Sequence, residues 1–196
     1  MKRQLSLTVA IAALALGAVG AHAASLLKNG SFEKGDFSHW NQGGDTGSTG
    51  VTSCTGSCDG NVTGAEDGAY YAYLGPVGSN GTLKQTVSDI SGQTLELSYW
   101  LASDGGTPND FIVRWDGTIL TSSTDLPNTN GWINFTLYVV GTGSDTLKFD
   151  FRNDPGYLAL DNVSLVSVPE PATWALMLAG FAGLGLALRR RRFAAV

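Results

Sequence analysis

Flat aromatic side chains and hydrogen-bonding side chains share one side of several alternating segments in the middle of this chain. Tryptophan and tyrosine rings stack on the apolar faces of sugars, while guanidinium, amide and carboxylate groups bond to sugar hydroxyls. The residues of this kind are Trp100, Arg114, Trp132, Asn134, Tyr138, Lys148, Asp150 and Arg152. They predict a sugar-binding face. The alternatives are a second buried sheet surface and a solvated, ion-paired face.

Groups suited to catalysis are scarce between residues 24 and 167. The segment has a single histidine, His39, and contains no nucleophile elbow, zinc-type histidine cluster or phosphate loop. Asp104, Asp110, Asp150 and Asp154 could in principle act in pairs on a glycosidic bond, but their spacing selects no pair. We therefore expect a protein that is not an enzyme, with a glycoside hydrolase as the weakest alternative.

The charges of the 196-residue chain are unevenly placed. Six of its twelve basic residues lie near the two ends, whereas sixteen of its seventeen acidic residues lie between Ala24 and Val168. That segment holds six basic side chains, so its formal charge is −10. Such a charge repels phosphate backbones and argues against a nucleic-acid partner.

The first 23 residues have the pattern of a secretory signal peptide. Lys2 and Arg3 precede an apolar run over residues 5–19, and Ala21-His22-Ala23 places small residues at a cleavage site. We expect the secretion machinery to export the chain and signal peptidase to cut before Ala24. The alternative is an uncleaved N-terminal anchor.

The last 29 residues combine three unlike features. The motif Val168-Pro169-Glu170-Pro171 precedes an apolar segment, 172–188, which is long enough for one short transmembrane helix. The tail, 189–196, opens with basic residues that should stay on the cytoplasmic side of the membrane. Those basic residues are Arg189, Arg190, Arg191 and Arg192.

Residues 24–167 read as one all-β domain. Short β-rich runs alternate with Gly, Ser, Thr, Asn and Asp at the spacing of a sandwich, and Asp116-Gly117 predicts a two-residue hairpin. Segments such as 94–102, 133–140 and 146–152 alternate apolar and polar residues, which indicates half-buried antiparallel strands. The predicted strands are 25–32, 69–74, 82–87, 94–102, 111–115, 118–121, 133–140, 146–152 and 158–167.

A stretch rich in Gly, Ser and Thr, residues 43–68, predicts a long surface loop. Both cysteines of the chain, Cys54 and Cys58, lie inside it. In an exported protein, two cysteines four residues apart most simply form a local disulfide.

The C-terminal segment, with its Pro-Glu-Pro motif, apolar helix and arginine stop, resembles the PEP-CTERM sorting signal of bacterial secreted proteins. The resemblance implies that an exosortase recognises the segment and removes the tail. It also implies transient anchoring in the inner membrane, followed by placement at the cell surface or outside the cell, in a bacterium that makes exopolysaccharide.

The two ends of the body resemble those of jelly-roll, galactose-binding-like domains, many of which are carbohydrate-binding modules. The resemblance rests on Leu27–Glu33 with Trp40, and on Leu160–Leu165. In such jelly rolls the first and last strands are neighbours, which would bring Glu33 near Asp161. Two facing carboxylates suit a structural Ca²⁺ ion. The alternative is that both carboxylates accept hydrogen bonds from turn amides.

Together these patterns and the two resemblances imply a jelly-roll β-sandwich that is exported and sorted to the cell envelope. We expect it to bind carbohydrate of the exopolysaccharide matrix. The alternative is a structural or adhesive surface protein without a dedicated ligand.

Overall fold

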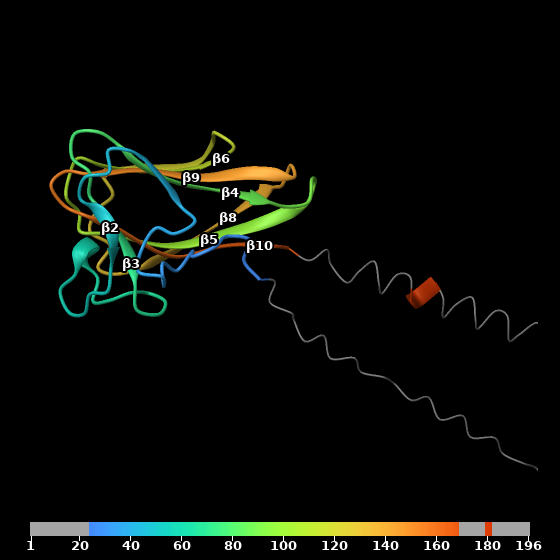
Figure 1. Ribbon diagram of the computed structural model, residues 1–196, viewed down its shortest axis with the longest axis horizontal. Coiled ribbons are helices and arrows are strands. Elements are labelled where there is room, and N and C mark those ends of the chain that lie inside the picture. Colours follow the sequence, from blue (N-terminus) through green and yellow to red (C-terminus); the bar gives the residue numbers. More distant parts are fainter. Residues whose placement is uncertain (1–23, 169–178, 182–196) are drawn as a thin grey trace, which may run out of the picture.

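The computed structural model describes residues 24–168 and 179–181, and the body forms two antiparallel sheets that face each other (Figure 1). The prediction of an all-β sandwich is confirmed. The predicted signal peptide, most of the transmembrane segment and nearly all of the sorting motif lie outside the described residues. Within the described ranges, no helix is both long and apolar enough to span a bilayer.

Each sheet has five strands. The first, sheet A, has the strand order β1-β4-β9-β6-β7, and the second, sheet B, has the order β2-β3-β10-β5-β8. Sheet A consists of β1 (Asn41–Gly44), β4 (Gly81–Ser88), β9 (Ser144–Asn153), β6 (Asn109–Trp115) and β7 (Thr118–Thr124). Sheet B consists of β2 (Thr49–Thr52), β3 (Tyr71–Leu74), β10 (Leu158–Ser167), β5 (Thr94–Ser103) and β8 (Ile133–Val140).

The core lies between the inner faces of the two sheets. Alternate residues of β4, β5, β6 and β9 are buried, as the period-two pattern predicts. Tyr99 of sheet B lies 5.9 Å from Phe111 and 5.7 Å from Phe149 of sheet A, between ring centroids. Alternation in the segment 133–140 places Ile133 on the apolar side, yet Ile133 is 42% exposed because it begins β8, an edge strand.

The predicted first strand, 25–32, is wrong as a strand, although the segment does run beside β10. Leu26 N donates to Leu165 O (2.8 Å) and Val163 N donates to Gly30 O (2.9 Å), but no ladder forms. The chain turns away at Asn29 and Phe32, which both have positive φ. Leu27, Phe32 and Trp40 are nevertheless buried and close one end of the core.

The predicted loop 43–68 is also partly wrong, because it contains the end of β1, all of β2 and a short 3-10 helix, η1 (Asp59–Asn61). The part after β2 folds back on the outer face of sheet B. Its Val62 joins Tyr71, Ala102 and Ala159 in a second buried cluster. A Cβ on Gly60 would lie 2.6 Å from the Ala159 Cβ, so only glycine allows this close approach.

The predicted hairpin at Asp116-Gly117 is confirmed. It joins β6 to β7, and both residues have positive φ, as a type I′ turn requires. Asp116 Oδ1 also accepts a hydrogen bond from Thr146 N of β9 (2.7 Å).

Three carboxylates meet at this hairpin: Asp116 of the turn itself, Asp89 just after β4, and Asp145 of β9. Contact with Asp145 raises the pKa of Asp116, whereas burial together with contact with Asp145 raises the pKa of Asp89. Burial alone would raise the pKa of Asp145 as well. Hydrogen bonds from Asp116, Asp89 and Thr142 outweigh burial and hold the pKa of Asp145 below its usual value.

We expect Asp116→Asn to stabilise the protein near pH 7. A raised folded-state pKa means that the stability from protonated Asp116 is present at low pH and is lost as the pH rises through that pKa. Asparagine supplies the N–H donor at every pH, keeps the acceptor for Thr146 and suits a type I′ turn. Thermal unfolding should give a higher Tm near pH 7, with a smaller gain near pH 4.

The control for this variant is Asp45→Asn, which also removes one charge. Among the described residues, the Asp45 carboxylate accepts one hydrogen bond, from the amide of Gly47. Equal gains in Tm from both variants would contradict the local explanation, since they would reflect net charge alone.

Candidate functional site

The residues predicted to form one sugar-binding face lie on two different sheets. Trp100, Asn134 and Tyr138 are on the outer face of sheet B, with Trp132 just before β8. Arg114, Lys148, Asp150 and Arg152 are on the outer face of sheet A. Because the outer faces of a sandwich point in opposite directions, the structure does not bring the full set together.

On sheet B, three successive cross-strand pairs of β5 and β8 form a polar strip. Its pairs are Trp100 with Asn134, Ser98 with Thr136, and Glu96 with Tyr138. Tyr138 is 64% exposed, and its hydroxyl donates to Glu96 Oε2 (3.0 Å). That hydrogen bond and the Glu96 charge raise the pKa of Tyr138.

The two aromatic rings stand at opposite ends of this strip. Trp100 is half-buried, and a separation of two pairs along the strands corresponds to about 13–14 Å. Between the rings lie the hydroxyls of Ser98 and Thr136, and Thr136 Oγ1 donates to Oδ1 of Asn134, the cross-strand partner of Trp100 (3.3 Å). The strip therefore offers two ring surfaces separated by hydrogen-bonding groups.

Trp132 belongs mainly to the second cluster. Its indole Nε1 donates to Gly64 O (3.0 Å), and its ring meets Tyr71 edge-on at 5.8 Å between centroids. Cys54 and Cys58, which a disulfide joins, also pack against this cluster. Trp132 thus holds the folded-back segment on sheet B, as the buried-surface alternative described.

The charged residues on sheet A form ion pairs. Asp150 contacts both Arg114 Nε and Lys148 Nζ at 2.7 Å, and Arg152 contacts Asp154 at 2.6 Å. The alternative of an ion-paired face thus describes this part of the predicted set.

Glu33 and Asp161 both accept hydrogen bonds from the turn that precedes β3. Glu33 Oε1 accepts hydrogen bonds from the amides of Ala69 (2.9 Å) and Tyr70 (2.8 Å). Asp161 Oδ2 accepts from the amides of Glu66 (2.8 Å) and Asp67 (3.1 Å). These are hydrogen bonds from turn amides, which is what the alternative to calcium described. The calcium site itself stays a prediction.

Asp161 is fully buried on the outer side of β10, beside Trp100 in the register. Burial raises the pKa of Asp161 to about 7, against the opposing effect of its three amide donors. Among the described residues, no group of three or more His, Cys, Asp or Glu side chains is arranged to hold a metal ion.

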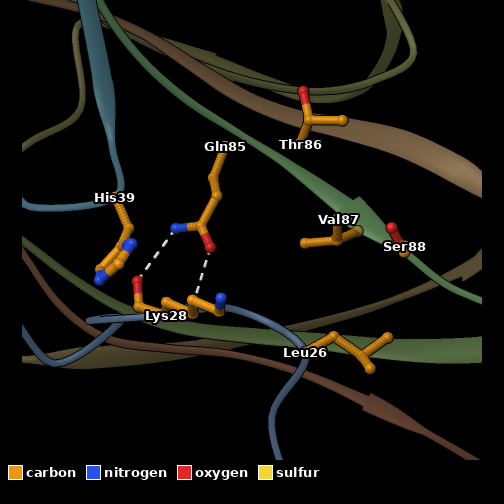
Figure 2. Close-up of a pocket in the computed structure, with 7 residues that line it drawn as sticks. All are labelled: Leu26, Lys28, His39, Gln85, Thr86, Val87 and Ser88. Carbon is orange, nitrogen blue, oxygen red and sulfur yellow. Dashed lines mark hydrogen bonds between the residues drawn. The ribbon is translucent and has the colours of Figure 1, made fainter.

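A cavity of about 370 Å³ lies between the N-terminal segment and β4. Figure 2 shows Gln85 reaching the main chain of Lys28 with both amide atoms, at 2.8 Å to its N and 3.0 Å to its O. His39 and Leu26 complete the wall near the segment. The Gln85 side chain thus supplies the main-chain hydrogen bonds that a neighbouring strand would otherwise provide to the N-terminal segment.

Sequence reasoning missed Glu96, Ser98 and Thr136 as members of the sheet B strip. Alternation already placed Glu96 and Ser98 on the side of Trp100, so a signal was present. The pairing of Glu96 with Tyr138 depends on the register of β5 against β8, which alternation alone does not specify.

With the geometry in place, the comparisons with known proteins address both parts of the chain. The PEP-CTERM protein-sorting motif matches residues 167–192. This chain carries that motif. The motif indicates an exported protein that transits the membrane, as expected from the C-terminal resemblance. No curated protein sequence matches the chain.

The solved structures similar to the body include carbohydrate-binding modules with a jelly-roll β-sandwich fold, which is the kind of fold that the resemblance implied. TmCBM61, a carbohydrate-binding module solved in complex with β-1,4-galactotriose, has a TM-score of 0.60 at 20% identity, covering 74% of this chain and 100% of the module. A cyclase from Fischerella sp. TAU has a TM-score of 0.56 at 17% identity, covering 75% and 98%.

A third similar structure is the K3 cleaved adhesin domain of Lys-gingipain from Porphyromonas gingivalis W83. Its TM-score is 0.52 at 17% identity, and the match covers 73% of this chain and 98% of that domain. At such identities the similarity establishes the fold, and the function has to be argued from the outer faces of the sandwich.

Proposed function

We propose that the body of this PEP-CTERM protein is an exported, non-catalytic module that binds carbohydrate of the extracellular matrix on the outer face of sheet B. The observation that carries the proposal is the strip of Trp100, Asn134, Glu96 and Tyr138. It places two rings at opposite ends, with the amide of Asn134 beside Trp100, the carboxylate of Glu96 beside Tyr138, and hydroxyl groups between the two pairs.

The strip matches the chemistry of a short oligosaccharide. Rings stack on the apolar faces of sugars, and the groups between them bond to hydroxyls. A separation of about 13–14 Å between the rings accommodates two to three sugar residues along the strands. The fold of TmCBM61, a galactotriose-binding module, supports the proposal as an analogy.

The sorting motif supports a second part of the proposal, processing by an exosortase. The motif at residues 167–192 begins at the last residue of β10. Cleavage inside the motif would therefore release the sandwich with all of its strands. After removal of the tail, we place the body at the cell surface or in the extracellular matrix.

A structural calcium ion at Glu33 and Asp161 is a third part of the proposal. The full burial of the Asp161 carboxylate supports it, because a buried charge gains from a cation. When bound, Ca²⁺ would offset the charge of the two carboxylates. The amide hydrogen bonds on both carboxylates oppose it, since they already supply partners.

Trp100→Ala should weaken binding to β-1,4-galactan about tenfold or more, because the stacking surface at one end of the strip is lost. Affinity electrophoresis and calorimetry would measure the change. Ile119→Ala is the matched control, since Ile119 is 51% exposed on β7 of the opposite sheet. Unchanged affinity in Trp100→Ala, or an equal loss in the control, contradicts the site.

Calcium at a hundredfold excess over its Kd should stabilise the protein by about 2.7 kcal/mol relative to EDTA, a Tm rise of several degrees. Glu33→Gln should abolish the rise, whereas Glu96→Gln should preserve it. Identical melting in calcium and EDTA would support the amide alternative.

Mass spectrometry of the protein from a host with an exosortase should find a new N-terminus at or within one residue of Ala24. It should also find that the segment after roughly Pro171 is absent. Deletion of the exosortase should restore the tail. An intact C-terminus in both hosts would contradict the processing part of the proposal.

A further inference from the structure

Three cations stand in a row across sheet A. Lys84 of β4 is directly opposite Lys148 of β9, and Lys148 is directly opposite Arg114 of β6. All three side chains are on the outer face, where Lys84 is exposed and the other two are about one-third exposed. Neighbouring strands thus place like charges next to each other twice in succession.

This arrangement costs folding stability, because like charges directly opposite in a sheet repel. Asp150 contacts Arg114 and Lys148 and offsets one of the three charges. Lys84 has no ion pair among the described residues. The row, defined as Lys84, Lys148 and Arg114, is therefore net positive on a body whose formal charge is −10.

The other charges on this face lie beside the row. Arg152 pairs with Asp154 and is opposite Asp110 in the register, so these three groups together carry one negative charge. Threonine hydroxyls flank the row, and Thr86 Oγ1 is hydrogen-bonded to Thr146 Oγ1 across the strands (2.9 Å). The outward residues of β4, β6 and β9 include no aromatic ring, so the face suits charged and hydroxyl-rich ligands and offers no stacking surface.

The geometry points to a second binding surface, on which the row holds the carboxylates of an anionic, uronic-acid-containing polysaccharide. Adjacent strands are about 4.8 Å apart, which is close to the length of one sugar residue in an extended chain. In an extended polyuronate, carboxylates on one side of the chain recur at every second residue, so two strand spacings, about 9.6 Å, would place them near Lys84 and Arg114. The inference rests on the proposed function for its extracellular carbohydrate, but it uses the face opposite the sheet B strip.

Charge complementarity selects this ligand. A neutral glycan gains nothing from three aligned cations, whereas a polyanion relieves their mutual repulsion when it binds. Two other anionic partners, nucleic acid and the acidic surface of a second copy of this chain, are outcomes of the test.

The test compares Lys84→Gln/Lys148→Gln with Lys28→Gln/Lys34→Gln in the full-length chain, in detergent. The two double variants lose the same charge, and both keep the arginine tail, so only the position of the lost charges differs. Polygalacturonate, β-1,4-galactan and duplex DNA are the probes, with sedimentation velocity to follow self-association.

We expect the row variant to bind polygalacturonate at least tenfold more weakly, with a smaller salt dependence, while the control variant binds like the wild type. Binding to β-1,4-galactan should not change in either variant. The row variant should also melt at the same temperature as the wild type or higher, because a repulsion is removed. This melting result separates lost binding from misfolding.

Equal binding of polygalacturonate by the two variants would overturn the inference. The inference would also be overturned if the wild type bound duplex DNA, or associated with itself, as strongly as it binds polygalacturonate, and if the row variant lost that binding. Failure of the proposed function is a separate result, in which galactan binding is absent or indifferent to Trp100→Ala while the row still binds polygalacturonate.

Discussion

The contact of Tyr99 with Phe111 and Phe149 joins the two sheets through the middle of the core. Because side chains alternate along a strand, burial of these rings determines that Trp100 and Lys148, their sequence neighbours, point outward. A shift of one residue in either strand would exchange core and surface. The chemistry of both outer faces therefore depends on the packing between the sheets.

The folded-back segment after β2 limits where a ligand can bind on sheet B. It covers the outer side of Tyr71, Ala102 and Ala159, and its Cys54–Cys58 disulfide packs against this buried cluster. Trp132 donates a hydrogen bond to Gly64 and so anchors this segment on the sheet. The strip on β5 and β8 is the part of the outer face that remains open. The outer face of sheet B is thus partly covered, whereas the outer face of sheet A carries ion-paired charges.

Alternation in the sequence was sufficient to predict the longer strands and the side of each residue. Alternation predicted the inward set of β5, and the Asp116-Gly117 dipeptide predicted the hairpin after β6, because both depend on local patterns. It did not predict which sheet each strand joins, since Arg114 and Trp100 show the same pattern but belong to opposite faces. That distinction arises from pairings between distant strands, as between β6 and β9.

The errors in the first half of the body have the same physical origin. β1 and β2 are four residues long and rich in glycine and polar residues, so they carry no alternation and depend on β4 and β3 for their hydrogen bonds. The segment 25–32 is apolar enough for a strand, but positive φ at Asn29 and Phe32 bends it. The row on sheet A was equally hidden, because Lys84 and Lys148 are 64 residues apart and meet only through register.

The path of β10 has a mechanical consequence. Figure 1 shows the body's first described residues and the end of β10 at the same end of the sandwich, and Leu26 is bonded to Leu165 there. Any tension applied through Val168 runs along β10, which is hydrogen-bonded to β5 along most of its length and to β3 at its far end. Load in that direction shears many bonds simultaneously instead of unzipping them singly. The strand next to the sorting motif is therefore the one best placed to resist being pulled from the domain.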